Sequence, residues 1–308
     1  MAWMSQIADA ATRIAGHVVR TPVIEVAVPG VAAPVLFKLE HMQHTGSFKA
    51  RGAFNTLLSK DVPAAGVVAA SGGNHGAAVA HAARTLGHPA AIFVPEIAGP
   101  AKIDLIRRTG ADLTVVPGEY VDAMAAARAH EDATGAMQIH AYDAVPTVAG
   151  QGTVMQEWRA QGLSDHTVFI AVGGGGLIAG ALAATEQGYD GRLIAVEPDT
   201  CAALSLARQA GAPVDVAVSG IAANALGARR IGQICFDLAQ AADTLCLTVS
   251  DTAIADAQRW LWQAHRVLVE PAGACALAAV LSGAYRPTKE ERLAVLVCGG
   301  NIAPDPLM

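Results

Sequence analysis

The sequence predicts an α/β fold in which a parallel sheet is covered by helices on both faces. Its predicted strands are continuous apolar runs, and longer segments of helical character alternate with them. Strands that do not alternate polar and apolar residues are typical of sheets buried on both sides. No repeat, low-complexity tract or Pro/Ser-rich linker divides the chain, so structured chain must cross any domain boundary.

Five strand–helix pairs carry this pattern, and a further strand closes it. Gly87 and Gly110 directly follow two of the predicted helices, as C-terminal caps commonly do. This regular alternation indicates a parallel sheet. The predicted pairs are 67–71 with 77–87, 90–95 with 101–110, 112–117 with 121–135, 167–172 with 177–188, and 192–198 with 203–211, and the closing strand is 293–298.

Composition limits the classes of partner. Apolar residues make up 53% of the 308 residues and charged residues 16%, against about 25% charged in an average globular domain. Such a chain buries much of its surface in a core or in an oligomer. The net charge is −6, and no basic stripe is present to neutralise a phosphate backbone. We therefore expect no nucleic-acid partner.

The cysteines and the N-terminal segment predict a cytoplasmic protein. The cysteines are odd in number and form no CxxC pair, which favours reduced thiols over disulfides or a zinc site. The first sixteen residues carry Asp9 and Arg13 within an amphipathic pattern, so they do not resemble a secretory signal. The five cysteines are Cys201, Cys235, Cys246, Cys275 and Cys298.

The uncharged stretch 167–185 is long enough to cross a membrane. Four consecutive glycines, Gly173 to Gly176, would break a helix in the middle of the bilayer. We therefore interpret the stretch as a buried strand, a loop and a packed helix, and expect no membrane association.

The same four glycines predict a phosphate site. Small residues let backbone N–H groups converge, and the start of the following helix adds positive potential. A plain strand–helix turn is the alternative, although a single glycine would suffice for it. The spacing matches neither a P-loop nor a dinucleotide-binding GxGxxG motif, which argues against nucleoside triphosphates and NAD.

Two more glycine-rich segments follow strands. The segment 71–76 exposes N–H groups that could hold a carboxylate, with Ser71 and Asn74 as further contacts; a tight turn that caps a helix is the alternative. We interpret His75 as a residue that structures this loop rather than as a base. In the segment 298–301, Cys298 on its own is typical of an inert buried thiol.

Among the lysines, only Lys49 lies between small and aromatic residues, in the segment 45–52. A lysine kept out of water has a lowered pKa and can form a Schiff base with an aldehyde cofactor. Lys49 is therefore the candidate nucleophile. The lysines are Lys38, Lys49, Lys60, Lys102 and Lys289.

These elements, in this order, resemble the fold-type II pyridoxal-phosphate enzymes, specifically the branch of serine/threonine dehydratases and serine racemases. The resemblance implies two doubly wound α/β domains, as in the tryptophan synthase β-subunit, with the active site between them. It places a large domain at 1–42 and 146–308 and a small mobile domain at 43–145. The matching segments are 20–23, 37–53, 70–76, 149–153, 172–180, 196–198, 270–274 and 298–301.

The resemblance also assigns roles. Lys49 would carry pyridoxal 5'-phosphate as a Schiff base and then act as the base at the substrate Cα. Phe48 would pack beside the pyridine ring, Asn74 would hydrogen-bond its 3-oxygen, and Cys298 would face its nitrogen. The phosphate would be bound by Gly173, Gly174, Gly175, Gly176 and Leu177, and the substrate carboxylate by Ser71, Gly72, Gly73, Asn74 and His75.

The implied reaction is dehydration and deamination of a small β-hydroxy amino acid, L-threonine or L-serine, to a 2-oxo acid and ammonia. A neutral thiol at Cys298 cannot keep the ring nitrogen protonated, so a long-lived carbanion is disfavoured and loss of a β-leaving group is favoured. Racemases of this family carry a serine where this chain has Gly72, which favours dehydration over racemisation. A homodimer is the usual form of the family.

The resemblance leaves a metal site open. Members that bind a divalent ion have a second acidic ligand after Glu197, and here that position is Ala203. Hard divalent ions usually need more than one carboxylate. Glu197 could therefore support a monovalent or a divalent cation, or act only as a structural carboxylate.

Other activities on the same fold are the alternatives. Serine racemase and 3-hydroxyaspartate dehydratase are the nearest, and the latter needs a cation near the β-substituent that the sequence does not locate. In a β-replacement synthase such as cysteine synthase the motif resembles Ser-x-Lys-Asp-Arg, whereas 47–51 reads Ser-Phe-Lys-Ala-Arg. A non-catalytic amino-acid sensor would have no need to keep Lys49.

Overall fold

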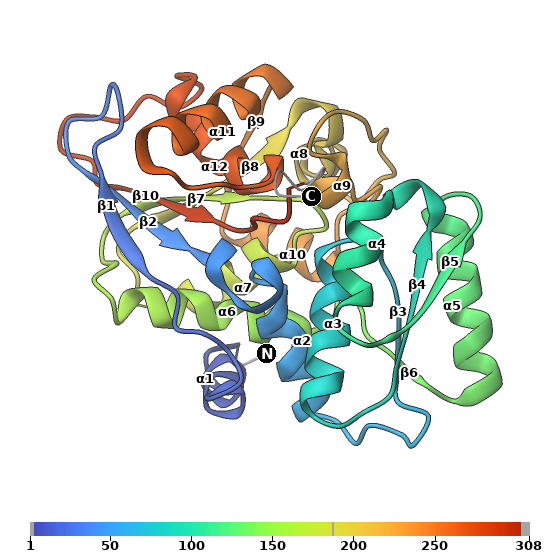
Figure 1. The fold of residues 1–308 in the computed structure, drawn as a ribbon. Coiled ribbons are helices and arrows are strands. Elements are labelled where there is room, and N and C mark those ends of the chain that lie inside the picture. The colour runs from blue at the N-terminus through green and yellow to red at the C-terminus, as the bar shows by residue number, and fades with distance from the viewer. Residues whose placement is uncertain (1–2, 187, 303–308) are drawn as a thin grey trace.

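The computed structural model describes residues 3–186 and 188–302 and has two sheets, each with helices around it (Figure 1). The larger sheet contains, in spatial order, β1 (Val23–Val26), β2 (Val35–Leu39), β10 (Leu293–Val297), β7 (Thr167–Ala171), β8 (Arg192–Pro198) and β9 (Leu245–Val249). The smaller contains β5 (Asp112–Val116), β4 (Ala90–Pro95), β3 (Val67–Ala70) and β6 (Met137–Gln138).

All neighbouring strands run parallel except β1 and β2, which are antiparallel. The strands β2, β7 and β10 are buried along their whole length, which explains why they are continuous apolar runs. The α/β fold and its parallel sheets are thus confirmed.

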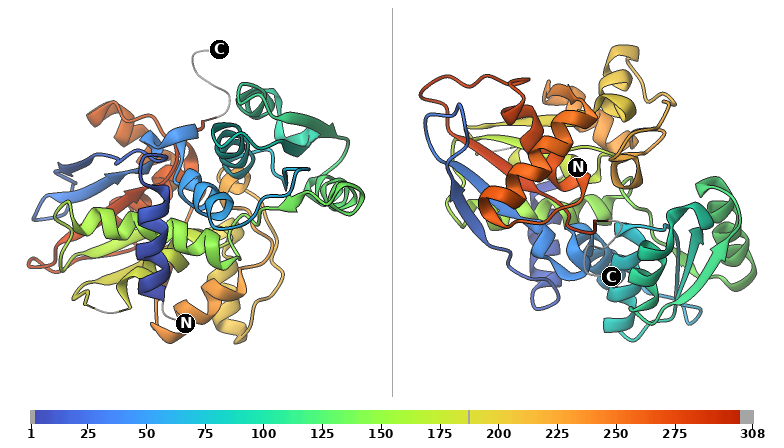
Figure 2. Two further views of the ribbon diagram at one scale, coloured as in Figure 1. Left: turned by 90° about the horizontal axis from the view of Figure 1, so that it is seen from below. Right: turned by 45° about the horizontal axis from the view of Figure 1, so that its top comes forward.

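Helices cover both faces of the larger sheet. One face carries α12 (Pro271–Leu281), with α11 (Asp251–His265) packed behind it. The other carries α7 (Gly176–Thr185), on which α6 (Val145–Arg159) packs, and α1 (Trp3–Ile14) crosses α6 in turn (Figure 2). Near β8 and β9 lie three shorter helices, α8 (Ala203–Ala210), α9 (Ala223–Leu226) and α10 (Gln233–Ala241).

The smaller sheet shows how alternate residues serve opposite faces. In β3, Val67 and Ala69 belong to a core shared with the helices on one face, whereas Val68 and Ala70 belong to a core formed with the helix on the other. The first face carries α2 (Lys49–Leu58), α3 (Asn74–Thr85) and α4 (Pro100–Arg107), and the second carries α5 (Tyr120–Thr134).

The predicted elements agree with these bounds to within a few residues. The largest shift at a helix start is in α3, which begins at Asn74 rather than at residue 77 because Asn74, His75 and Gly76 form its first turn. The segment 167–185 is indeed a strand, a short loop and a helix. No helix in the described residues is both long and apolar enough to cross a membrane.

The two sheets divide the sequence as a two-domain fold requires. Every strand of the larger sheet lies within 23–39 or 167–297, and every strand of the smaller lies within 67–138. The views in Figure 1 and Figure 2 show two lobes with α2 between them. The domain limits at 42/43 and 145/146, and the mobility of the small domain, stay predictions.

Candidate active site

The three glycine-rich segments all follow the carboxyl ends of parallel strands. One connects β3 to α3, one connects β7 to α7, and one follows β10. Ligands bind at such strand ends in open α/β sheets, because the chain leaves the sheet there and helix N-termini point toward the opening. The geometry of each segment decides what it can hold.

The segment that carries Lys49 pairs with the segment after β10. Ser47 and Gly299 form an isolated antiparallel bridge, the amide of Phe48 donates to the carbonyl of Cys298 at 3.2 Å, and the amide of Gly300 donates to the carbonyl of Gly46 at 2.9 Å. Lys49 is the first residue of α2. The backbone of the candidate nucleophile is therefore fixed to the end of the central strand of the larger sheet.

The Lys49 amine donates a hydrogen bond to the carbonyl of Ala141 at 2.9 Å and lies 5.1 Å from the centre of the Phe48 ring. Burial lowers the pKa of Lys49 to about 8, and electrostatic contributions from Cys298 and Glu270 oppose that shift. A larger fraction of this amine is neutral near pH 7 than of an ordinary lysine, so it is prepared to act as a nucleophile or a base.

The loop before α7 tolerates nothing larger than glycine. An added Cβ at Gly174 or Gly176 would lie 2.3 or 2.8 Å from atoms of Tyr142, and one at Gly173 would lie 2.8 Å from Leu226. Gly175, the N-cap of α7, has a φ of +93° and no side chain to accept hydrogen bonds from the first turn. The amides at the start of α7 therefore suit an anionic group.

In the segment that leads into α3 and forms its first turn, the polar side chains have defined contacts, and the Ser71 hydroxyl accepts the amide of Gly73 at 3.2 Å. Asn74 donates through Nδ2 to Glu270 Oε1 at 2.5 Å and accepts through Oδ1 from Asn301 at 2.7 Å. His75 donates from Nε2 to the carbonyl of Ile139 at 2.9 Å, and burial together with the nearby charge of Lys49 lowers its pKa to about 3. His75 is thus neutral and engaged with backbone, as a loop-structuring residue would be.

Cys298 lies at the end of β10 and is buried. Its thiol donates to the carbonyl of Ala272 at 3.3 Å. Burial, reinforced by the charge of Glu270, raises the pKa of Cys298 far above its ordinary value. The thiol therefore stays neutral at physiological pH.

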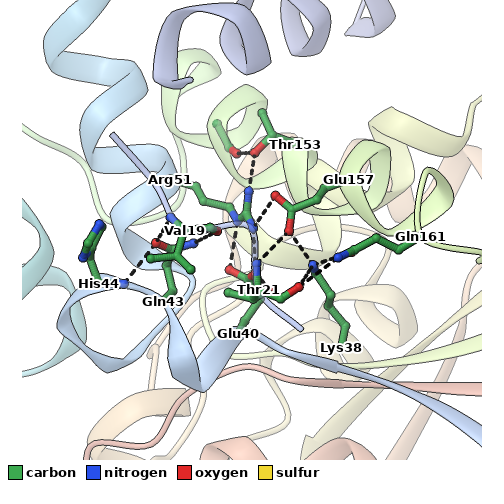
Figure 3. Close-up of polar contacts among 11 residues, drawn as sticks. Val19, Thr21, Lys38, Glu40, Gln43, His44, Arg51, Thr153, Glu157 and Gln161 are labelled. Atoms are coloured by element: carbon green, nitrogen blue, oxygen red, sulfur yellow. Dashed lines mark hydrogen bonds and ion pairs between the residues drawn. The ribbon is translucent and has the colours of Figure 1, made fainter. Parts of the chain in front are cut away.

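A buried ion cluster anchors α2 through Arg51 (Figure 3). Arg51 binds Glu40 through two hydrogen bonds of 2.7 and 2.8 Å and Glu157 through one of 3.0 Å, and Glu157 also pairs with Lys38. Burial alone would lower the pKa of Arg51, but the two carboxylates raise it. The cluster joins β2, α2 and α6, so it fixes the helix on which Lys49 stands.

Glu197 contacts the start of α8. One carboxylate oxygen accepts the amide of Leu204 at 2.7 Å, and the other accepts the amide and the hydroxyl of Ser205 at 2.8 and 2.6 Å. Ala203, where a second acidic ligand was expected, contributes only a methyl group. Within the described part of the chain, no cluster of three or more His, Cys, Asp or Glu residues could hold a metal ion.

Several contacts of this site were not predicted from the sequence. Glu270 and Asn301 lay in recognised segments but had no assigned role, and their alignment with Asn74 appears only in the structure. Ala141 contributes a carbonyl oxygen, which no side-chain pattern announces. Tyr142 follows it and packs on the glycine loop, where an aromatic residue next to a glycine run offered no distinct signal.

Comparisons with known proteins agree with this geometry. The family model described as "Pyridoxal-phosphate dependent enzyme" matches residues 14–299. The chain is 34% identical over 305 residues to phenylserine dehydratase of Ralstonia pickettii, which covers 97% of this chain and 93% of that protein. It is 33% identical over 271 residues to L-threonine ammonia-lyase of Thermotoga maritima, covering 87% of this chain and 67% of that protein.

The fold is also that of a solved relative. The structure of maize serine racemase superposes with a TM-score of 0.93 at 31% sequence identity, covering 99% of this chain and 95% of that one. The similarity therefore includes both sheets and all three glycine-rich segments. The chain belongs to the family of pyridoxal-phosphate dependent enzymes, in the group that contains dehydratases, ammonia-lyases and serine racemases.

Proposed function

We propose that this enzyme eliminates water from a small β-hydroxy amino acid, L-threonine or L-serine, and that hydrolysis of the unsaturated amino acid so formed gives a 2-oxo acid and ammonia. The observation that carries the proposal is the Lys49 amine, whose burial lowers its pKa to about 8 and whose nearest hydrogen-bond partner is a backbone carbonyl. The names of the relatives, an L-threonine ammonia-lyase and a phenylserine dehydratase, support elimination from a β-hydroxy amino acid.

The residues present fit pyridoxal phosphate. Four glycines, each closely approached by neighbouring atoms, precede a helix start without a capping side chain, which suits the phosphate. The Lys49 amine suits the aldehyde, and Phe48 beside it suits the flat face of a ring. The amides at the start of α3 suit a substrate carboxylate, and they are supplied by the loop from Ser71 to His75.

When bound, the cofactor withdraws electrons from the substrate Cα and so makes its proton removable. In our proposal, Lys49 removes that proton, because its lowered pKa leaves a usable fraction of the neutral amine. Asn74 would hydrogen-bond the ring oxygen, and Cys298 would face the ring nitrogen. The neutral thiol of Cys298 holds no charge there, and this favours prompt departure of the β-hydroxyl over a long-lived carbanion.

Serine racemase is the second candidate, supported by the 0.93 TM-score to the maize enzyme. Racemisation needs an acid on the opposite face of the substrate, and Gly72 supplies no side chain there. An added Cβ at Gly72 would lie 2.5 Å from the Ala98 side chain and 2.8 Å from that of Val94. A serine would therefore require the neighbouring segment to move, so we place dehydration first.

A substrate panel tests the proposal. The purified enzyme with pyridoxal phosphate would be incubated with L-threonine, L-serine, D-serine, L-threo-3-hydroxyaspartate and phenylserine, and 2-oxo acid, ammonia and the serine enantiomers would be measured. We expect oxo acid and ammonia in equal amounts, with the highest kcat/KM for L-threonine or L-serine. D-Serine formed from L-serine faster than oxo acid would support the racemase, and no oxo acid from any substrate would overturn the dehydratase.

We further propose that the enzyme works in the cytoplasm as a homodimer. All five cysteines are free in the structure, which suits a reducing compartment. The apolar side chains of Met42, Trp262 and Leu268 are 52, 48 and 38% exposed, which is compatible with surface covered by a second copy. Light scattering during size-exclusion chromatography would give the mass, and a mass of one chain would contradict the homodimer.

A further inference from the structure

We propose that Glu270 is a positioning residue that fixes the side-chain amide of Asn74 and leaves one of its N–H groups to face the cofactor. The inference rests on the proposed function, because that function gives Asn74 the ring oxygen of the cofactor as its partner. Glu270 precedes α12 and is only 3% exposed. A series of hydrogen bonds runs from the carbonyl of Thr45 through Asn301 and Asn74 to this carboxylate.

This series of hydrogen bonds defines the orientation of both amides. A backbone carbonyl only accepts, so the atom of Asn301 that lies 2.7 Å from the carbonyl of Thr45 must be the donor Nδ2. That nitrogen also lies 2.7 Å from Asn74 Oδ1, which must accept. The other end of the Asn74 amide, Nδ2, then faces Glu270 Oε1 at 2.5 Å. Both ends of the series agree, so neither amide can flip without losing hydrogen bonds.

This orientation limits what Asn74 can offer to a ligand. Its Nδ2 carries two hydrogens, and one of them is used by Glu270. The remaining hydrogen is a donor, so the ring oxygen that meets it is held as an acceptor and its deprotonated form is favoured. The Glu270 carboxylate holds the nitrogen end of the amide in place, so that a donor rather than the Asn74 carbonyl oxygen is offered to the ring oxygen. Glu270 thus acts on the cofactor through Asn74 without touching it.

The backbone around the series of hydrogen bonds makes room for it. An added Cβ at Gly46 would lie 2.4 Å from Asn301 Oδ1, and one at Gly299 would lie 2.1 Å from Glu270 Oε1. Thr45, whose carbonyl begins the series, adopts a left-handed conformation with φ 60° and ψ 17°, which residues other than glycine rarely adopt. The two glycines and the strained Thr45 therefore make room for the same series of hydrogen bonds.

Glu270 also affects the reacting amine. Burial lowers the pKa of Lys49, and the contributions of Cys298 and Glu270 oppose that shift. Since burial keeps the Cys298 thiol neutral, the opposing charge is that of Glu270. Removing this charge should lower the pKa of Lys49 further. A purely structural residue would not produce such a change in the pH profile.

The test uses the cofactor-loaded enzyme and the variant Glu270→Ala, which removes the acceptor of the Asn74 amide together with its charge. We expect the long-wavelength absorbance of the bound cofactor, which reports a deprotonated ring oxygen, to lose intensity to the short-wavelength band. We expect kcat to fall on the order of tenfold, as for the loss of one charge-assisted hydrogen bond, with KM changed less. The acidic limb of the plot of kcat against pH should move to lower pH, because the pKa of Lys49 falls when the charge of Glu270 is removed.

A second variant separates orientation from charge. Asn301→Ala releases the other end of the Asn74 amide but keeps the Glu270 carboxylate, so it should change the absorbance in the same direction and leave the position of the pH profile unchanged. Glu290→Gln removes an exposed carboxylate and serves as the control, with no change expected in absorbance, kcat or pH profile.

The outcomes distinguish this inference from the proposed function. If the wild-type enzyme is coloured and active, and Glu270→Ala matches it in absorbance, kcat and pH profile, the positioning role is overturned and the proposed function stands. If the wild-type enzyme takes up no cofactor, the proposed function itself fails. Should Glu270→Ala not fold by circular dichroism, an unchanged absorbance in Asn301→Ala would overturn the positioning role.

Discussion

Two buried lysines lie close together in the sequence and have opposite surroundings. Lys38, in β2, donates to the carbonyl of Thr21 at 2.8 Å and to Gln161 at 2.7 Å, and it pairs with the carboxylate of Glu157. Lys49 donates to one backbone carbonyl and faces an aromatic ring. Burial lowers the pKa of both. The Glu157 carboxylate opposes the shift of Lys38 through a direct hydrogen bond as well as its charge, whereas Glu270 opposes the shift of Lys49 only through its charge.

The difference shows that the partners of a buried lysine, rather than burial itself, decide whether it is structural or reactive. A lysine surrounded by acceptors keeps its proton and holds elements together. A lysine with a single neutral acceptor can lose its proton at little cost and become a nucleophile. Four predictions test this comparison, in order of expected effect.

The largest effect is expected on turnover. Lys49→Ala should lower kcat by about 10³-fold or more, because it removes both the covalent attachment and the base, while the circular dichroism spectrum stays that of the wild type. Lys38→Met should keep its turnover per folded molecule within about threefold, since it touches no reacting atom. Measurement of 2-oxo acid release tests both, and an active Lys49→Ala would move the base to another residue.

The next effect is expected on stability. Lys38→Met removes one of the two cationic partners of Glu157, which keeps Arg51. We therefore expect the free energy of unfolding to fall by about 2 to 3 kcal/mol, as for the loss of a hydrogen-bonded charge from a buried cluster. Denaturation in urea at pH 7 gives this value. A loss below about 1 kcal/mol would mean that the ion cluster tolerates an uncompensated charge and that Lys38 is no structural counterpart to Lys49.

Lys49→Met should change stability in the opposite direction. The pKa of Lys49 is about 8 in the folded protein and 10.5 for an ordinary lysine, so at neutral pH the folded state binds this proton less tightly than the unfolded state. The variant should therefore be more stable by about 2 kcal/mol without cofactor at pH 7, after allowance for partial exposure of the amine. The gain should shrink as the pH rises from 8 to 10.5, because wild-type stability increases there.

The control for that prediction is the exposed lysine Lys60. Lys60→Met should show no such gain and no dependence on pH over the same range. Thermal denaturation of both cofactor-free variants at several pH values makes the comparison. A loss of stability in Lys49→Met at pH 7 would show that its amine is held by stronger interactions than the hydrogen bond to Ala141.

The smallest effect extends the comparison to a buried carboxylate. The oxygens of Glu197 accept three hydrogen bonds from the start of α8, so we expect a chelator to change neither Tm nor turnover, and Ser205→Ala to cost about 1 kcal/mol. Differential scanning fluorimetry with and without chelator measures the first. A fall in Tm of several degrees on chelation would indicate a cation at Glu197 after all.

The strands β3, β4, β5, β7, β8 and β10, and the helices that follow the first five of them, were predicted from the sequence because their signals are local. Continuous apolar runs marked these strands, and glycines marked the helix ends and the loops after the strands. The antiparallel strand β1 lacked such a signal, since it is short and only partly buried. The helix α3 began earlier than predicted because Asn74 and His75 are poor helix formers that the loop geometry places in the first turn.

The site was only partly predictable, for a different reason. Lys49, Asn74 and Cys298 stood out by residue type and position, but the pairing of Ser47 with Gly299 joins residues far apart in the chain. The carbonyl of Ala141 and the amides of α8 are backbone groups, which every residue possesses. The ion cluster could have been predicted only by knowing which faces of α2 and α6 meet β2. Contacts of these kinds become visible only in three dimensions.

The position of β10 has a consequence for biosynthesis. It is the last strand along the described chain, yet it lies between β2 and β7 inside the larger sheet, and the Lys49 segment is tied to the residues that follow it. A ribosome must therefore deliver the chain as far as the residues after β10 before the lysine pocket can close. The lobe around β3 to β5, whose strands are near neighbours in sequence, can form earlier, so coenzyme capture has to wait until β10 has been synthesised.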